Sequence, residues 1–303
     1  MATGKGASGP TKRDRREEAR EHARLMREEA AKKAKRRKFV VQGSIIVAVV
    51  AVLAIVGVFI LNGVNAANNV ANPKNMQSGG VLLTSATKAV TTPAIPKGGK
   101  ATPTKQELDG KTAHIVIYVD YQCPICNQFE TTNADQIKQW MADGQATLET
   151  HPVAILDSAN NKKYSTRSAA AASCVANYDP NNFFAVNSAL YANQPDEQTG
   201  TGLTNAELLK VFKDAGASSK QITDCVNDQT FAQFITNQTK SVVTDPDLVN
   251  AASGSFGTPT VFVNGQRYAG SVSDATQFAT FVGTAVQEAG TGSTGTPTPT
   301  PTK

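Results

Sequence analysis

The chain has 303 residues and a formal net charge of +5, and 40% of its residues are hydrophobic, so it is long enough to bury a core. The charge is concentrated at one end: residues 1–38 hold 14 Lys and Arg against 6 Asp and Glu, a net charge of +8, and the remainder carries −3. Because the basic charge lies outside the bulk of the chain, this distribution argues against a globular nucleic-acid-binding protein.

The first two segments predict a membrane anchor with a cytoplasmic N-terminus. Residues 1–38 form a basic tail, and the segment Phe39–Leu61 contains no charged residue. As a helix this segment spans ~34 Å, enough to cross a bilayer. The alternative is a signal peptide cleaved after Ala66, but the apolar run and the preceding basic region are both long for that purpose. The positive-inside rule then places everything after Leu61 outside the cytoplasm.

Residues 62–105 are rich in Asn, Ala, Thr, Pro, Gly and Lys, a composition typical of an extracytoplasmic linker. Within it, Val81–Thr84 is a candidate edge strand of the following domain. At the other end of the chain, residues 289–303 alternate Thr and Pro and predict a disordered tail.

The region between these segments, residues 106–288, predicts one α/β domain. The apolar run His114–Val119 is typical of a central strand. We expect the following elements in chain order: a helix from Pro124 to about Met141, a strand within Ala146–Leu156, helices from about Tyr164 to Val243, a hairpin over Thr260–Ala269 that turns at Asn264-Gly265, and a helix from about Ser273 to Glu288. The order implies a sheet interrupted by a helical insert at about residues 160–245.

Four cysteines are present, and two of them form a Cys-x-x-Cys motif at Cys123 and Cys126. The motif follows a predicted buried strand and opens a helix, so one helical turn brings both sulfurs together. Free backbone N–H groups at the helix start stabilise a thiolate, which is the attacking species in disulfide exchange. Pro124 suits the first helical position. A zinc site lacks a second local ligand pair, a c-type haem site requires His where Asn127 stands, and a structural disulfide across so short a loop stabilises little.

A second motif, Gly257-Thr258-Pro259-Thr260, leads directly into the predicted strand at residues 261–263. A proline at the entrance of a core strand is unusual, because it lacks a ladder N–H. With these two motifs, residues 106–288 resemble the DsbA-like disulfide oxidoreductases of the thioredoxin superfamily. The resemblance implies a thioredoxin-like fold with a helical insertion, here preceded by the predicted transmembrane helix.

The resemblance also assigns roles to individual residues. Cys123 is implied to be the nucleophile, Cys126 the resolving cysteine and Pro259 a cis proline facing them. Thr258, Pro124 and Ile125 are implied to contact the substrate. The chain departs from well-known members in having Ile125 rather than His between the cysteines, and Thr258 rather than Val before the proline. These departures leave its oxidising strength open.

Cys174 and Cys225 lie in the predicted helical insert. Outside the cytoplasm they are expected to form a structural disulfide worth about 4 kcal/mol; the alternative is a second redox relay. Asp120 and Glu130 flank the motif; one reading is that they tune Cys123 or shuttle a proton, but we interpret them as surface-facing polar residues. His114 is interpreted as a satisfied strand-end residue. His151 and Trp140 suggest no constellation.

Three functions remain open from the sequence. The leading hypothesis is a membrane-anchored oxidase that introduces disulfides into secreted or cell-envelope proteins and is regenerated by a quinone-linked membrane partner. The second is a reductase or isomerase of the same fold, and the third is a non-catalytic binding or chaperone module. No metal, cofactor or nucleic-acid partner is expected.

Overall fold

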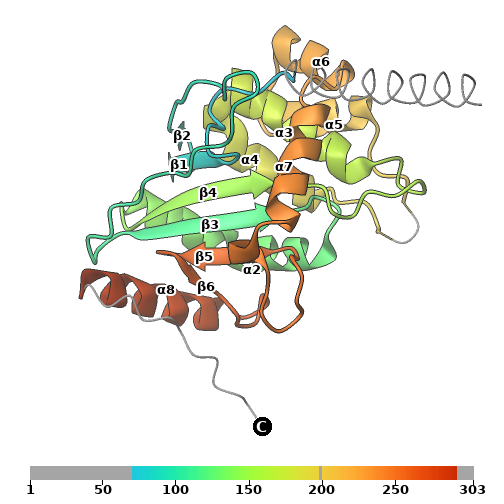
Figure 1. Cartoon of the computed structure of the whole chain (residues 1–303). Coiled ribbons are helices and arrows are strands. Elements are labelled where there is room, and N and C mark those ends of the chain that lie inside the picture. Colours follow the sequence, from blue (N-terminus) through green and yellow to red (C-terminus); the bar gives the residue numbers. More distant parts are fainter. Residues whose placement is uncertain (1–69, 198–199, 292–303) are drawn as a thin grey trace, which may run out of the picture. The chain divides into compact units, whose positions relative to one another are not determined.

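The computed structural model describes residues 70–197 and 200–291, and the helix and strand labels below are those of Figure 1. A six-stranded sheet of order β2-β1-β4-β3-β5-β6 forms its centre. The strands are β1 (Val81–Ser85), β2 (Lys88–Ala89), β3 (Ala113–Val119), β4 (Ala146–Pro152), β5 (Thr260–Val263) and β6 (Gln266–Arg267). Strands β3 and β4 are parallel, and the other neighbouring pairs are antiparallel.

Strand β3 is central, as its apolar sequence predicts, because it pairs with β4 on one side and β5 on the other. Its alternate residues Ala113, Ile115, Ile117 and Val119 are buried. A strand with partners on both sides satisfies its backbone groups inside the protein. The predicted α/β architecture with β3 as a central strand is therefore confirmed.

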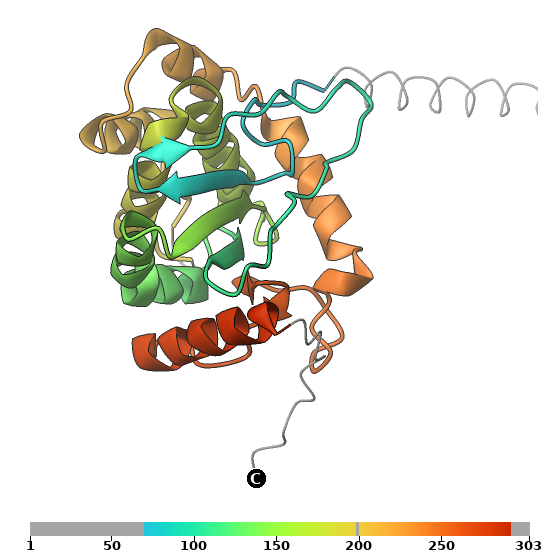
Figure 2. The same cartoon turned by 90° about the vertical axis from the view of Figure 1, so that its left-hand side faces the viewer.

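Helices cover both faces of the sheet. Helices α2 (Pro124–Ala142) and α8 (Ala275–Gly290) share one face, where Phe129 meets Phe278 edge to face with ring centroids 5.1 Å apart. Helix α7 (Ala232–Val243) crosses the opposite face, as Figures 1 and 2 show from perpendicular directions. This layering places the end of β3, and the start of α2 that follows it, at one edge of the α/β sandwich.

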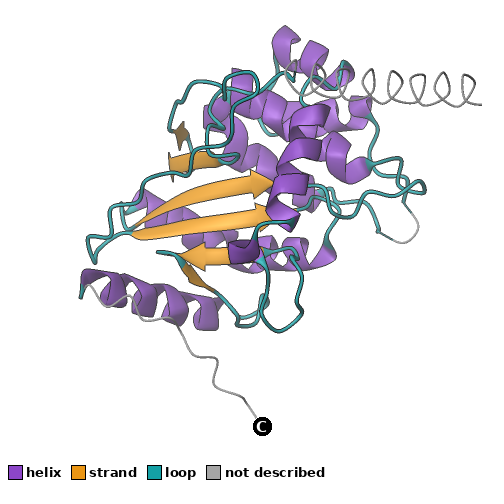
Figure 3. Ribbon diagram, in the orientation of Figure 1, coloured by secondary structure: helices purple, strands orange, loops and turns teal. Residues whose placement is uncertain are grey.

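The helical insert lies between β4 and β5. It comprises α3 (Tyr164–Tyr178), α4 (Phe183–Ala192), α5 (Asn205–Asp214), α6 (Lys220–Asn227) and α7, together with the short 3-10 helices Pro180–Asn182 and Pro246–Leu248 (Figure 3). Helix α3 is almost wholly buried, and its run Ala169–Ala172 is at most 1% exposed. Small side chains of this kind let neighbouring helices pack closely around α3, so it serves as the core of the insert.

Residues 70–105 are not the linker that their composition predicts. Met76, Val81 and Leu83 are fully buried, and the Asn75 side-chain amide donates to the carbonyl of Ala176 at 2.8 Å. The candidate edge strand at residues 81–84 is β1, but β2 pairs with its outer side, so β1 is not the edge. The folded domain therefore begins no later than residue 70. The polar composition misled the prediction because turns between short strands use the same residues as linkers.

Within residues 70–197 and 200–291, none of the helices combines the length and the apolar character that a bilayer crossing requires. The predicted anchor at residues 39–61, the predicted tail at residues 1–38 and residues 292–303 of the predicted C-terminal tail lie outside the described residues. Residues 289–290 of the C-terminal tail belong to α8, so they are helical and not disordered as predicted.

Candidate redox site

The two cysteines of the motif lie at the junction between the end of β3 and the start of α2. Cys123 is the residue immediately before the helix, Pro124 is its first residue, and Cys126 lies in the first turn. The Cys123 N–H donates to the carbonyl of Asp120 at 3.0 Å, which fixes the tight turn between strand and helix. Both thiols are free, and Cys123 and Cys126 are 6% and 2% exposed. Cys123 thus occupies the N-cap position of α2, next to the first backbone N–H groups of the helix, which lack intrahelical partners; its thiol forms no capping hydrogen bond.

The surroundings of Cys123 favour its thiolate. They lower the pKa of the Cys123 thiol to about 6, chiefly through a hydrogen bond from the thiol of Cys126. Burial opposes this effect, while the Thr258 side chain and the backbone N–H groups of Ile125 and Cys126 reinforce it. All the groups that lower the pKa are neutral donors close to the sulfur. Because the thiolate is the nucleophile, Cys123 is the more reactive member of the pair near neutral pH.

Cys126 has the opposite character. Burial, together with the hydrogen bond and charge of Cys123, raises the pKa of the Cys126 thiol well above its ordinary value. Cys126 therefore keeps its proton while Cys123 carries the charge. Two thiols with such different pKa values have different roles in disulfide exchange. The sulfur of Cys123 acts as the nucleophile or the leaving group, and the sulfur of Cys126 resolves the mixed disulfide.

The loop before β5 faces the pair. The Thr258–Pro259 peptide bond is cis, and the thiol of Cys123 donates to the carbonyl of Thr258 at 3.3 Å. Phe256, in the same loop, packs edge to face against Tyr118 of β3 with ring centroids 6.0 Å apart. Two loops from distant parts of the sequence thus meet around one sulfur. Of the residues with an implied substrate contact, Thr258 is half-buried, Pro124 is exposed and Ile125 is 48% exposed.

The other two cysteines lie elsewhere in the fold. Cys174 of α3 and Cys225 of α6 form a disulfide with a Cα–Cα distance of 5.9 Å and a sequence separation of 51. Both residues are almost fully buried within the insert. The bond ties two insert helices together and leaves the Cys123–Cys126 pair as the free thiols of the described chain.

Asp120 and Glu130 are not the surface-facing residues that we expected. Asp120 is fully buried, and its carboxylate accepts backbone N–H groups from Gln122, Ile155 and Leu156 at 2.8–3.0 Å. Burial raises the pKa of the Asp120 carboxyl. Glu130 accepts from the Ser188 hydroxyl at 2.7 Å, and burial likewise raises its pKa. The loop after β4 contacts Asp120 and helix α4 of the insert contacts Glu130, and each of these segments is distant in sequence from the residue that it contacts.

Two of the three histidines belong to the described structure. His114 is satisfied as expected, by Thr147 Oγ1 and the carbonyl of Glu107, each at 2.9 Å. His151 does form a constellation, contrary to expectation. Its Nε2 lies 3.0 Å from Glu149 Oε1, and its ring stacks on Tyr118 with centroids 4.5 Å apart.

The His151–Glu149 pair is structural in character. Burial acts to raise the pKa of Glu149, but the hydrogen bond and charge of His151 hold it below its usual value, with help from Ser78 and Thr104. Neither the His151 nor the Glu149 side chain contacts a cysteine.

Trp140 packs against Phe278, with ring centroids 6.0 Å apart. In the part of the chain that the structure describes, no three His, Cys, Asp or Glu side chains converge as metal ligands would.

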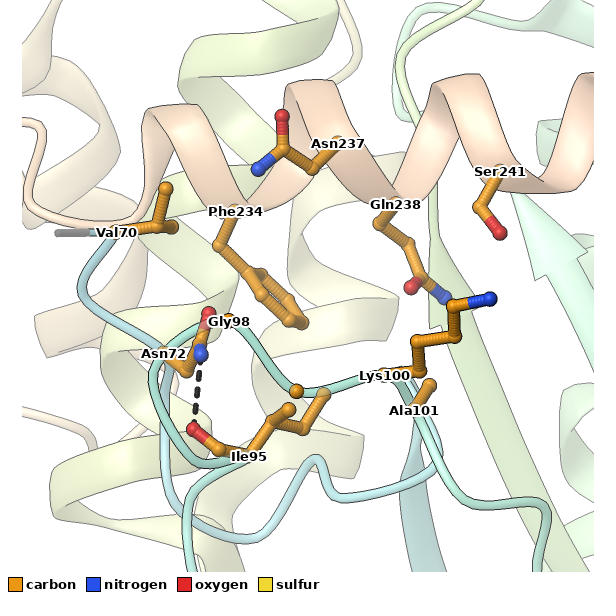
Figure 4. Close-up of a pocket in the computed structure, with 11 residues that line it drawn as sticks. Val70, Asn72, Ile95, Gly98, Lys100, Ala101, Phe234, Asn237, Gln238 and Ser241 are labelled. Atoms are coloured by element: carbon orange, nitrogen blue, oxygen red, sulfur yellow. Dashed lines mark hydrogen bonds between the residues drawn. The ribbon is translucent and has the colours of Figure 1, made fainter. Parts of the chain in front are cut away.

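A cavity of about 400 Å³ lies on the α7 face, away from the cysteines. Phe234, Asn237 and Gln238 of α7 line one side, and the Ile95–Ala101 segment lines the other (Figure 4). Asn72 closes one end and donates from its side chain to the carbonyl of Ile95 at 2.8 Å. No cysteine lines this cavity, so it is separate from the redox pair.

Some residues at the site carry no signal in the sequence. The Asn127 side chain donates to Gln194 and to the carbonyl of Tyr191, and Gln194 donates to the backbone around Cys123. Gln194 lies about 70 positions after the motif, as the separations of 71 and 73 residues show. Nothing in its local sequence marks it, because the contact arises only when the insert folds onto α2.

Comparison with known proteins gives results that agree with this geometry. A family model described as Thioredoxin matches residues 110–282. The crystal structure of reduced DsbA from Mycobacterium tuberculosis is similar, with 25% sequence identity, a TM-score of 0.53, and coverage of 71% of this chain and 100% of that chain. The reduced form of the disulfide bond oxidoreductase DsbG from the same organism has 28% identity, a TM-score of 0.48, and coverage of 60% and 85%.

A curated relative is a much longer protein. The chain is 34% identical over 152 residues to the serine/threonine-protein kinase PknE of Mycobacterium tuberculosis (strain ATCC 25618 / H37Rv). The aligned stretch is 49% of this chain but only 26% of the kinase, so the chain spans a minor part of the length of the curated relatives that it matches.

Proposed function

This chain belongs to the thioredoxin family, and from this premise we propose that it is a DsbA-like protein-disulfide oxidoreductase, specifically a dithiol oxidase acting through Cys123 and Cys126. The observation that supports the direction of the reaction is the low pKa of Cys123, about 6. A stabilised thiolate stabilises the reduced pair, which makes the corresponding disulfide a better oxidant.

The reaction proceeds in two exchanges. In the oxidised protein, a substrate thiolate attacks Cys123 Sγ, a mixed disulfide forms, and Cys126 leaves and takes up a proton. The second substrate thiolate then attacks the substrate sulfur of this mixed disulfide and releases the Cys123 thiolate. Two electrons pass from the substrate dithiol to the cysteine pair, and the substrate becomes a disulfide. The low pKa of Cys123 makes it the better leaving group in the second step.

Within this proposal, the substrates are secreted or cell-envelope proteins and the domain works outside the cytoplasm on the anchor at residues 39–61. The buried Cys174–Cys225 disulfide supports an oxidising compartment. Thr258, Pro124 and Ile125 surround the attacked sulfur and are placed to contact the substrate chain. A quinone-linked membrane partner accepts the two electrons and restores the Cys123–Cys126 disulfide.

The test is the reduction potential of the full chain in detergent, equilibrated with glutathione buffers. A potential near −120 mV, as in strong oxidases, is expected, whereas one near −270 mV would indicate a reductase. The Cys123→Ser variant is the control: its oxidation of a reduced protein substrate must be lost. If that variant kept the activity of the native chain, the domain would be a binding or chaperone module rather than an oxidase.

A further inference from the structure

The side chain of Gln194 connects the helical insert to the backbone of the redox motif. This residue follows α4 by two positions and is half-buried. Its Nε2 donates to the carbonyl of Tyr121 at 2.9 Å and to the carbonyl of Cys123 at 3.0 Å. Its Oε1 accepts from the Asn127 side chain at 3.0 Å. A carboxamide nitrogen has two hydrogens, so both donors of Gln194 are committed to the backbone on either side of the nucleophile.

Two further hydrogen bonds fasten the same segments together. The Asn127 side chain also donates to the carbonyl of Tyr191 at 3.1 Å, and the Gln122 side chain donates to the carbonyl of Pro195 at 3.2 Å. The contacts therefore join residues 121–127 to residues 191–195, and we call this set the amide clasp. Helix α4 supports the clasp, because Leu190 and Tyr191 are buried and hold its end in place.

The clasp acts on the backbone that sets the position of Cys123 Sγ. The carbonyl of Cys123 belongs to the peptide unit shared with Pro124, and its direction defines the ψ angle of Cys123, which is 118°. That carbonyl already accepts the first helical N–H, from Asn127, at 3.2 Å. The bond from Gln194 adds a second restraint on the same oxygen. The angle in turn decides whether the sulfur faces the N–H groups of Ile125 and Cys126, which stabilise its thiolate.

We infer that Gln194 is a positioning residue for the redox reaction: through the amide clasp it holds the backbone of Cys123 at the start of α2 and so fixes the position of the sulfur. The inference rests on the proposed function and deepens it, because it makes the helical insert part of the device that sets the oxidising strength. Gln194 acts through the backbone of Cys123 and does not contact the sulfur.

The experiment compares three variants with the native chain, all as full-length protein in detergent. Gln194→Met keeps the length of the side chain and removes every hydrogen bond. Gln194→Glu keeps the acceptor for Asn127 but removes both donors and adds a negative charge. Gln221→Met makes the same chemical change at an exposed position of α6 and is the matched control. Each protein is titrated by the ultraviolet absorbance of the thiolate and equilibrated with glutathione.

In Gln194→Met, the pKa of Cys123 is expected to rise by about 1 unit, since weakened hydrogen bonds to the charged form disfavour it. At pH 7 such a rise makes the pair about fivefold less oxidising in the glutathione equilibrium. The pKa in Gln194→Glu should rise at least as far, because the added charge repels the thiolate. Gln221→Met should match the native chain in both measurements.

A lowered melting temperature with an unchanged pKa and glutathione equilibrium in Gln194→Met would overturn the inference, since it would show a purely structural role. If Gln194→Met does not fold, the pKa of Cys123 in Gln194→Glu decides: a native value refutes the inference, and a rise that persists at high salt, where repulsion by the added charge is screened, supports it. The proposed oxidase function is judged separately, by the potential of the native chain and by Cys123→Ser. The role of Gln194 can therefore be refuted while the oxidase function stands, and the oxidase function can be refuted by measurements that do not involve Gln194.

Discussion

The pH profile of Cys123 alkylation tests the asymmetry of the redox pair. Only the thiolate reacts with iodoacetamide, so the rate follows the ionised fraction. With the pKa of Cys123 at about 6, the thiolate population is about 10% at pH 5 and about 90% at pH 7. An ordinary cysteine, with a pKa of about 8.5, is only about 3% ionised at pH 7. We expect the rate for the reduced chain to rise with a midpoint near pH 6.

The assay is a rate measurement at a series of pH values, with mass spectrometry to identify the modified residue. Its midpoint is independent of the low accessibility of Cys123, because limited access scales the rate equally at every pH. In the Cys126→Ala variant the midpoint should move upward by about 1 unit, since the hydrogen bond from the Cys126 thiol is the largest effect lowering the pKa of Cys123. A midpoint above pH 8 in the native chain, or no shift in the variant, would refute this account of the thiolate.

Three further changes have defined outcomes. Replacing both Cys174 and Cys225 by Ala should lower the free energy of unfolding by about 4 kcal/mol, because the bond closes a loop of 51 residues; urea denaturation without reductant measures it, and a loss below about 1 kcal/mol would contradict the chain-entropy account. The folded-state pKa of Glu149 is held below its usual value by His151, so its stabilising contribution is present above the unfolded pKa near 4.5 and is lost as the pH falls through the lower folded value. In Glu149→Gln the melting temperature should therefore decrease less on acidification than in the native chain. An equal decrease would show that the Glu149–His151 pair does not cause the loss of stability at low pH. Ile125→His places an imidazole at an exposed position beside Cys123, and should lower the pKa of the Cys123 thiol and make the pair more oxidising below pH 6.5; an unchanged glutathione equilibrium at pH 6 would show that the side chain points away from the sulfur.

The parts of the fold that the sequence predicts are those set by local patterns. The apolar run of β3, the motif that opens α2 and the Asn264-Gly265 turn each depend on neighbouring residues, and each element lies where its pattern places it. The boundaries agree less closely, since α8 runs over Ala275–Gly290 rather than ending at Glu288. Helix ends depend on capping and packing as well as on periodicity, so a shift of this size is expected.

The errors concern residues whose environment is formed by distant segments. Asp120 reads as a polar residue in a loop, yet the N–H groups of residues 155–156 come to its carboxylate and burial follows. Residues 70–105 read as a spacer because their buried side chains, such as Met76 and Ile95, are isolated among polar ones. Gln194 is ordinary in its own neighbourhood and acquires meaning only against Cys123. In each case the partner is tens of residues away, beyond the reach of periodicity.

The way Cys123 is stabilised also follows from the charge of the chain. After residue 38 the net charge is −3, so the domain as a whole offers a thiolate no attraction at long range. The residue between the motif's proline and second cysteine is Ile125, which supplies no positive charge either. The thiolate therefore depends on neutral groups close to the sulfur: the Cys126 thiol, the Thr258 side chain and the backbone N–H groups of Ile125 and Cys126. Such groups stabilise the thiolate only when the backbone holds them in place, because a hydrogen bond to the sulfur weakens steeply with distance and with departure from linearity. That dependence explains why residues remote in sequence from Cys123, just after α4 and in the loop before β5, pack closely around it.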